Sequence, residues 1–202
     1  MIGICEIIPK GKNKFGVRFD NGVILPLYKG EIKNYKIQKD AFISEEIFMS
    51  LLNEVVGKRA KKRAMHLLEQ QDRTEKQLRD KLFLNDYPEE CIDMAIDYVK
   101  QYNYLNDVRY AECFVRLGQE KYSKTQLCQK LLTKGIKKEI IYRVLEDLYE
   151  TDEDTLIYSL LAKRHYDADK CDDKEFNRTY QYLLRRGFAS RDILKAMKKN
   201  DL

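Results

Sequence analysis

An internal repeat restricts the fold of this chain more than any other feature of its sequence. Apolar residues with helical spacing recur in three copies, the second 49 residues after the first and the third 52 residues later: Leu78, Leu82, Tyr87, Ile92 and Ile96; Leu127, Leu131, Ile136, Ile141 and Leu145; Leu183, Phe188, Ile193 and Met197. In each copy a helical segment ends in a short turn, one apolar residue follows, and another helical segment begins. Self-similarity at a fixed period predicts stacked helical units instead of one large core.

The turns and helix starts of these copies carry matching signals. The three turns have Asp or Gly in second place, residues that tolerate left-handed backbone at a helix end: Asn85-Asp86, Lys134-Gly135 and Arg186-Gly187. Thr74 and Ser123, also 49 residues apart, are each followed three residues later by a glutamine, Gln77 and Gln126. Both pairs predict a capping box, in which the hydroxyl accepts from the glutamine's amide and the glutamine side chain reaches back. Pro88 is expected at the first position of the next helix.

A further helix is expected at the start of each copy, at 64–71, roughly 107–121 and roughly 155–166. The unit is then three helices in about 50 residues, longer than the helical-pair repeats of about 34 residues. The predicted fold is mainly α, with three tandem three-helix repeats that form an elongated curved rod. The expected divisions are a β-rich extension at 1–43, a helix plus the first repeat at 44–105, and the second and third repeats at 106–151 and 152–202.

The first 43 residues follow a different pattern. Ile4–Ile8, Lys14–Phe19 and Val23–Tyr28 are short β-rich runs separated by turn sequences, which predicts a small antiparallel meander. Such a sheet is marginal alone and has to pack on something, so it either caps the repeats or adds a partner contact. Ser44 is the expected N-cap of the following helical region, which fits one long helix or two helices end to end. The acidic run at 146–154 predicts another helix N-terminus.

Composition and cysteine spacing indicate a protein of the reducing cytoplasm. Five cysteines are odd in number and form no C-x-x-C pair, so we expect free thiols buried on helix faces and neither disulfides nor a metal site. No apolar run approaches the roughly 20 residues needed to span a bilayer, and no signal peptide is recognisable. We expect a cytoplasmic monomer.

The sequence contains no recognisable catalytic constellation. His66 and His165, the two histidines, fall on expected helices without a nucleophile or carboxylate set in a family pattern. The segment Gly11-Lys12-Asn13-Lys14 lacks the spacing of a phosphate-binding loop and is interpreted as a hairpin turn. The chain is therefore expected to be no enzyme and to need no cofactor.

Several fragments resemble the RecX family of recombinase regulators, in the right order and at the right spacing. They are Ala64-Met65-His66-Leu67-Leu68, Asp72-Arg73-Thr74-Glu75-Lys76-Gln77-Leu78, Lys81-Leu82, Leu105-Asn106-Asp107-Val108-Arg109-Tyr110-Ala111, Lys134-Gly135-Ile136 and Tyr182-Leu183-Leu184-Arg185-Arg186-Gly187-Phe188. The chain departs from the family at Gln71, where Arg is frequent, and at Ser123, where Gly is frequent. The resemblance implies a protein that binds the RecA filament, lies along its groove and inhibits ATP hydrolysis and strand exchange.

Positive charge marks the candidate contact residues. The net charge is only +5, but cations cluster at 58–63 and around the second and third turns. The candidates for contact with a partner or with DNA are Lys58, Arg59, Lys61, Lys62, Arg63, Arg73, Arg109, Lys134, Lys137, Lys138, Arg185, Arg186 and Arg191. A solvated helix face explains the 58–63 run equally well, and pairing between helices is an alternative for Arg73 and Arg109.

Three hypotheses of function follow from these features. The first is a regulator that binds the RecA filament and contacts single- or double-stranded DNA weakly and without sequence preference. The second is a stand-alone DNA-binding regulator, because three-helix units can be helix-turn-helix modules. The third is a repeat scaffold for an unrelated partner. A further interpretation, stacking of single-stranded bases on Tyr98, Tyr102 and Tyr104, competes with ordinary packing of these rings.

Overall fold

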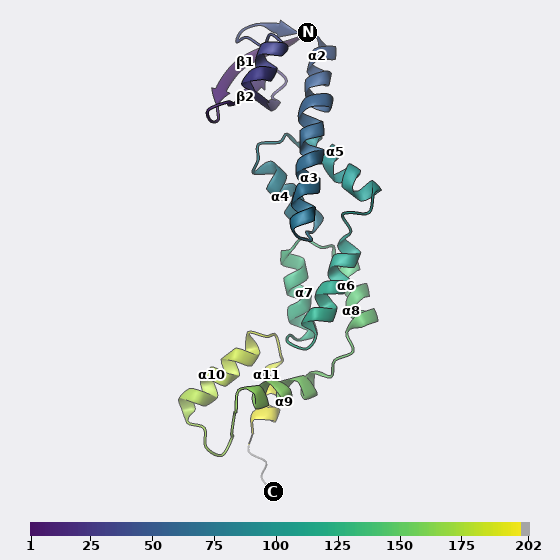
Figure 1. The fold of residues 1–202 in the computed structure, drawn as a ribbon. Coiled ribbons are helices and arrows are strands. Elements are labelled where there is room, and N and C mark those ends of the chain that lie inside the picture. Colours follow the sequence, from purple (N-terminus) through teal and green to yellow (C-terminus); the bar gives the residue numbers. More distant parts are fainter. Residues whose placement is uncertain (199–202) are drawn as a thin grey trace. The chain divides into compact units, whose positions relative to one another are not determined.

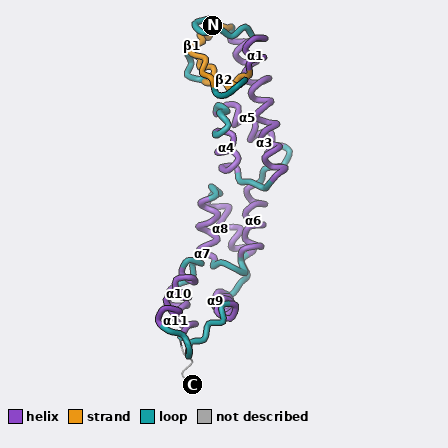
Figure 2. Tube along the Cα trace, turned by 60° about the vertical axis from the view of Figure 1, so that its left-hand side comes forward, coloured by secondary structure: helices purple, strands orange, loops and turns teal. Residues whose placement is uncertain are grey.

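The computed structural model describes residues 1–198, which fall into two compact units. The first unit is Met1–Asn106 and the second begins at Asp107. Figure 1 follows the chain through both units, and Figure 2 separates the strands of the first unit from its helices. No helix among the described residues is long and apolar enough to cross a membrane.

The N-terminal sheet is antiparallel, as the sequence predicts, but it has a fourth strand. Strands β1 (Ile2–Pro9), β2 (Lys14–Phe19), β3 (Ile24–Tyr28) and β4 (Phe42–Ile43) lie in the order β3-β2-β1-β4. The prediction of three strands missed β4 because a two-residue strand has no periodicity of its own. It also missed the short helix α1 (Lys29–Asn34) that follows β3.

The outer edge of β3 is blocked by its own chain. Pro26 has no N–H, and its carbonyl accepts a hydrogen bond from Arg59 Nη1 at 2.7 Å. The Tyr28 N–H donates to Glu31 Oε2 at 2.7 Å. These contacts occupy backbone groups with which another strand would pair, so this edge is protected against added strands.

A continuous helical path connects the sheet to the first repeat. Helix α2 (Glu45–Ser50) begins at Ser44, whose Oγ accepts from Ile47 N at 3.2 Å and confirms the predicted N-cap. The path continues through a π-helical segment, η1 (Leu51–Gly57), into α3 (Lys58–Gln70). It is therefore one bulged helix, the first of the two arrangements left open by the sequence.

The first repeat shares its core with the sheet. Helices α3, α4 (Glu75–Phe83) and α5 (Glu89–Gln101) contribute buried side chains to one continuous cluster that includes Val17 and Leu25 of the strands. Thr74 forms the complete predicted capping box, because its Oγ1 accepts from Gln77 N and its N–H donates to Gln77 Oε1, both at 3.2 Å. Pro88 is the N-cap of α5, one position earlier than predicted.

The second and third repeats each have a buried cluster of their own. Their helices are α6 (Asp107–Gly118), α7 (Lys124–Thr133) and α8 (Lys138–Leu148), then α9 (Glu153–Lys163), α10 (Asp173–Leu184) and α11 (Ser190–Met197). Asp152 is the N-cap of α9 and accepts from Thr155 N at 2.9 Å, which confirms the prediction for the acidic run. The three predicted left-handed turn residues are also confirmed, with φ of 67° at Asp86 and 83° at Gly135 and Gly187.

The capping box predicted at Ser123 is half wrong. Ser123 Oγ does accept from Gln126 N, at 3.2 Å. The Ser123 N–H, however, donates to the carbonyl of Arg186 at 3.2 Å, and Gln126 Nε2 donates to the carbonyl of Arg185. The polar groups that would complete the box instead join the second repeat to the turn of the third.

Two further predictions fail on local detail. His165 lies in the turn after α9 with left-handed backbone, φ 55°, instead of on a helix. Cys5 and Cys113 are exposed, so burial holds for Cys91 and not for every thiol. Cys5 lies on β1, where its side chain faces solvent.

Candidate partner-binding surfaces

The basic run at the start of α3 divides into an inward part and an outward part. The Arg59 guanidinium forms an ion pair with Glu31 and lies 4.5 Å from the ring centre of Tyr28. These contacts fix Arg59 between the sheet and the helix. Arg63, one turn later, is half-buried. Neither side chain is presented fully to a partner.

The outward part of the run forms a shallow groove with a tyrosine of α5. The groove has a volume of about 550 Å³ and is lined by Lys58, Lys61, Lys62, Met65, His66, Glu69 and Tyr98. Lys58 is paired with Glu54 at 2.5 Å, and its hydrogen bond lowers the pKa of that carboxyl. Lys61 Nζ lies 5.5 Å from the ring centre of Tyr98. Among the described residues, neither Lys61 nor Lys62 has a carboxylate partner within ion-pair distance.

Two more tyrosines extend this groove beyond the end of α5. The ring centres of Tyr98 and Tyr102 are 5.0 Å apart, and those of Tyr102 and Tyr104 are 6.2 Å apart with the latter rings stacked. We call the combined feature the lysine–tyrosine surface, which consists of Lys58, Lys61, Lys62, Tyr98, Tyr102 and Tyr104. The sequence places each residue on or after a helix, but the structure shows that the lysines of α3 and the rings of α5 are adjacent.

Arg73 and Arg109, for which the sequence left pairing between helices open, lie in the first and the second unit, respectively. Arg73 Nε donates to the carbonyl of Leu67 at 3.3 Å and thereby closes the end of α3. Arg109 is exposed on α6. An arginine that the charge pattern did not single out, Arg79, joins α4 to α5 through Glu89 at 3.0 Å and Asp93 at 2.7 Å.

The candidates at the second turn lie around the start of α8. The Lys134 ammonium lies over the rings of Phe114 and Tyr110, 5.3 and 5.6 Å from their centres. Lys137 is the N-cap of α8 and Lys138 its first residue, and both are exposed. These two lysines are open to solvent at a helix N-terminus, where the helix dipole does not favour cations.

The third turn contains one inward and one outward arginine. The Arg186 guanidinium lies 4.4 Å from the ring centre of Tyr182 and 5.4 Å from that of Tyr122, and its Nη1 donates to the carbonyl of Lys121 at 2.7 Å. It therefore joins the third repeat to the second. Arg185 is exposed, and Arg191 is exposed at the start of α11.

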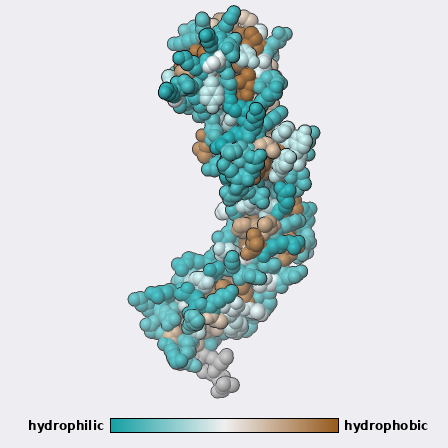
Figure 3. Space-filling view, viewed as in Figure 1, coloured by the Kyte–Doolittle hydropathy of each residue, from teal (hydrophilic) through white to brown (hydrophobic). Residues whose placement is uncertain are grey.

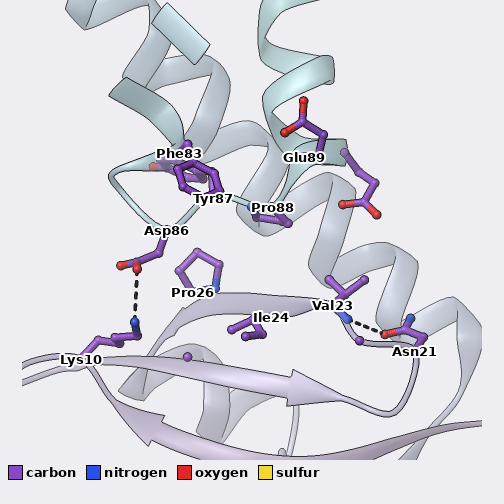
Figure 4. Close-up of a pocket in the computed structure, with 13 residues that line it drawn as sticks. Lys10, Asn21, Val23, Ile24, Pro26, Phe83, Asp86, Tyr87, Pro88 and Glu89 are labelled. Carbon is purple, nitrogen blue, oxygen red and sulfur yellow. Dashed lines mark hydrogen bonds and ion pairs between the residues drawn. The ribbon is translucent and has the colours of Figure 1, made fainter. Parts of the chain in front are cut away.

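A cleft of about 600 Å³ lies between the sheet and the α4–α5 turn (Figure 4). Lys10 and Asp86 face each other across one side, with Lys10 Nζ 3.3 Å from Asp86 Oδ1, and Lys14 Nζ is 2.8 Å from Asp86 Oδ2. The hydrogen bond from Lys14 holds the pKa of the Asp86 carboxyl below its usual value. Phe83 is 69% exposed beside Pro26 and Pro88.

The lining of this cleft combines charged and apolar side chains. Its 13 lining residues include no Ser, Thr, Cys or His, and its titratable side chains are Lys10, Asp86, Tyr87, Glu89 and Glu90. Groups of three or more His, Cys, Asp or Glu side chains able to hold a metal ion do not occur in the described part of the chain. Figure 3 shows that hydrophilic residues cover most of the visible face, with small apolar areas between them.

Comparison with known proteins identifies related sequences along most of the chain. Residues 60–98 match the family description "RecX, first three-helix domain", and residues 152–197 match "RecX, third three-helix domain". A regulatory protein RecX of Caldanaerobacter subterraneus is 34% identical over 162 residues, which cover 80% of this chain and 80% of that protein. One from Clostridium botulinum is 32% identical and covers 96% of this chain and 92% of the relative.

Solved structures agree with these sequence matches. A crystal structure of a regulatory protein RecX aligns over 98% of both chains with a TM-score of 0.59 and 21% identity, which supports the fold. A RecX structure from Lactobacillus salivarius aligns over 70% of this chain and 94% of its own, with a TM-score of 0.53 and 26% identity.

Proposed function

This chain belongs to the RecX family of regulatory proteins, and we propose that it binds the RecA filament on DNA and inhibits its ATP hydrolysis and strand exchange. The observation that carries this proposal is the match to RecX proteins over 80% or more of the chain. The protein acts by binding and carries out no chemistry of its own.

The distribution of exposed cations supports binding along a nucleoprotein filament. Lys62, Lys138 and Arg191 are exposed in the first, second and third repeats, respectively. Several weak contacts on one chain strengthen one another, because each binding event raises the effective concentration of the next. Arg59 and Arg186 are fixed within the fold, and each holds the elements of its own unit in place.

The test is DNA-dependent ATP hydrolysis by RecA on single-stranded DNA with substoichiometric amounts of the purified chain. We expect a fall in the rate of hydrolysis and in the yield of strand-exchange product. Unchanged hydrolysis at all ratios refutes the proposal. Tight, sequence-selective binding to duplex DNA without RecA would indicate the stand-alone regulator instead.

A charge-reversal variant refines this test. Lys137→Glu/Lys138→Glu places acids at the start of α8, where the helix dipole favours them, so folding is not weakened. We expect this variant to inhibit RecA less than the parent chain does. Lys12→Glu, at an exposed hairpin position in the N-terminal sheet, is the control and should inhibit normally.

A further inference from the structure

The first repeat exposes a series of aromatic rings that its own core does not use. Tyr102 is 55% exposed and Tyr104 is 49% exposed, although their rings are stacked on each other and Tyr102 also contacts Tyr98. Aromatic rings grouped in this way on a surface indicate a contact with a flat partner group, because burial of their faces would stabilise a complex.

Cations adjoin this series on one side. Lys61 lies over the Tyr98 ring, and Lys62 is exposed next to it on α3. Two other exposed lysines of the described chain are paired with acids, Lys76 with Asp80 and Lys195 with Asp154, both at 3.0 Å. Glu54 neutralises Lys58, and Glu69 lies 4.0 Å from His66, so Lys61 and Lys62 keep their charge available in the groove.

We propose that the lysine–tyrosine surface binds single-stranded DNA, with the Lys61 and Lys62 ammonium groups on backbone phosphates and the Tyr102 and Tyr104 rings stacked on bases. Single strands are bound without sequence preference by this combination of a cationic groove and aromatic platforms, because every base has a π-face. The identity of the strand as DNA rests on the proposed function.

The combination of groups selects this ligand over two others. An acidic peptide would pair with the lysines and leave the rings exposed. Duplex DNA presents phosphates on its outside while its bases are stacked inside, so it also would use only the lysines. Only an unpaired strand uses both the charges and the rings, and the two are adjacent at Tyr98.

The experiment measures the affinity of the full chain, without RecA, for fluorescein-labelled oligonucleotides by anisotropy. The probes are a dT strand, an abasic strand of equal length and charge, a duplex and a uridine RNA strand. The parent chain should bind the dT strand more tightly than the abasic strand and the duplex. Equal affinity for dT and abasic strands refutes stacking, and tighter binding of the RNA refutes the assignment to DNA.

Variants locate the site. Tyr102→Ala should weaken dT binding about tenfold, the loss of one base stack, and should leave abasic binding unchanged, whereas Tyr102→Phe should retain the affinity. Tyr142→Ala is the matched control, because Tyr142 is 57% exposed on α8.

Lys61→Gln/Lys62→Gln should reduce the slope of log affinity against log salt concentration by about 1.4, the value for two phosphate contacts on a single strand.

The outcomes separate this inference from the proposed function. If Tyr102→Ala weakens dT binding no more than Tyr142→Ala does, the lysine–tyrosine surface is not the site, whatever the effect of the chain on RecA. If the oligonucleotide results are as expected while RecA hydrolysis is unchanged, the surface is supported and the proposed function is refuted. Circular dichroism of each variant verifies that it is folded.

Discussion

Replacing Gly187 by alanine should separate the third repeat from the second. Gly187 has φ 83°, a left-handed conformation that costs a residue with a Cβ about 1–2 kcal/mol. A Cβ at this position would also lie 2.5 Å from Ser123 Oγ, 2.8 Å from Gln126 Cβ and 3.0 Å from Gln126 N. Ser123 Oγ cannot move away freely, because it is fully buried and accepts the Gln126 N–H as the N-cap of α7.

The expected cost is the sum of these effects. Overpacking of this kind costs about 1–3 kcal/mol, and displacement of the N-cap hydroxyl adds about 1 kcal/mol. With the backbone strain of about 1–2 kcal/mol, Gly187→Ala should lower the free energy of unfolding of the second unit by about 3–6 kcal/mol. This is a large part of the total stability of an ordinary domain, which is about 5–15 kcal/mol.

Gly22→Ala provides the matched control. Gly22 has the same φ of 83°, but no atom lies within 4 Å of its added Cβ. Only the backbone strain of about 1–2 kcal/mol applies there. The difference between the two variants therefore isolates the clash of Gly187 with Ser123 and Gln126.

Urea unfolding followed by circular dichroism measures the loss, and amide hydrogen exchange locates it. The Ser123 N–H donates to the Arg186 carbonyl across this contact, so its exchange should accelerate in Gly187→Ala and remain slow in Gly22→Ala. Equal destabilisation by the two substitutions, with Ser123 still protected in both, would refute the argument.

Two more predictions concern ionisation. The pKa of Asp86 is lowered, first by the Lys14 hydrogen bond, so the contribution of this ion pair to stability is full above the unfolded-state pKa of about 3.9 and is lost as pH falls through the lower folded-state value. Asp86→Asn keeps the left-handed turn, should cost no more than about 1 kcal/mol at pH 7, and should reduce the fall in unfolding free energy that urea titrations measure below about pH 4. If that fall is the same in the variant as in the parent chain, the ion pair is not its source. Burial raises the pKa of the Cys91 thiol to about 12, so iodoacetamide at pH 8 should label Cys5 and Cys113 rapidly and Cys91 only after unfolding; mass spectrometry that finds Cys91 labelled at the rate of Cys5 would contradict this.

The sequence predicted the features that depend on local backbone chemistry. Left-handed residues at Asp86, Gly135 and Gly187 follow from the few side chains that accept this conformation at a helix end. The Thr74 capping box follows from hydroxyl and glutamine at a three-residue spacing. Each signal lies within one turn of backbone, so no knowledge of the tertiary structure is needed to read it.

The features that the sequence missed depend on groups distant along the chain. Arg59 and Lys61 lie on either side of the buried Ala60, so helical periodicity predicts the same degree of burial for both. Only the position of the sheet decides between them, because Pro26 and Glu31 cover one side of α3 and bind Arg59. The same holds for Gln126. Its side chain does not accept from the Ser123 N–H, as the capping box predicts, but donates to the carbonyl of Arg185 in a turn 59 residues away.

The turns of the first and third repeats suggest what the N-terminal sheet contributes. In the third repeat the carbonyl of Arg186, the residue before the left-handed Gly187, accepts from the Ser123 N–H of the preceding repeat. In the first repeat the equivalent carbonyl, that of Asn85, accepts from Lys14 Nζ of the sheet at 3.1 Å. In these two repeats the carbonyl follows the end of a helix and has no intrahelical partner, so a donor from outside the repeat satisfies it.

The first repeat has no repeat before it, and the hairpin of the sheet supplies that donor in its place. The buried cluster that the strands share with α4 and α5 removes the apolar side of the repeat from water in the same way. Of the two roles left open for residues 1–43, a cap on the first repeat therefore explains both the polar and the apolar contacts of the sheet, whereas a role as a partner contact explains neither.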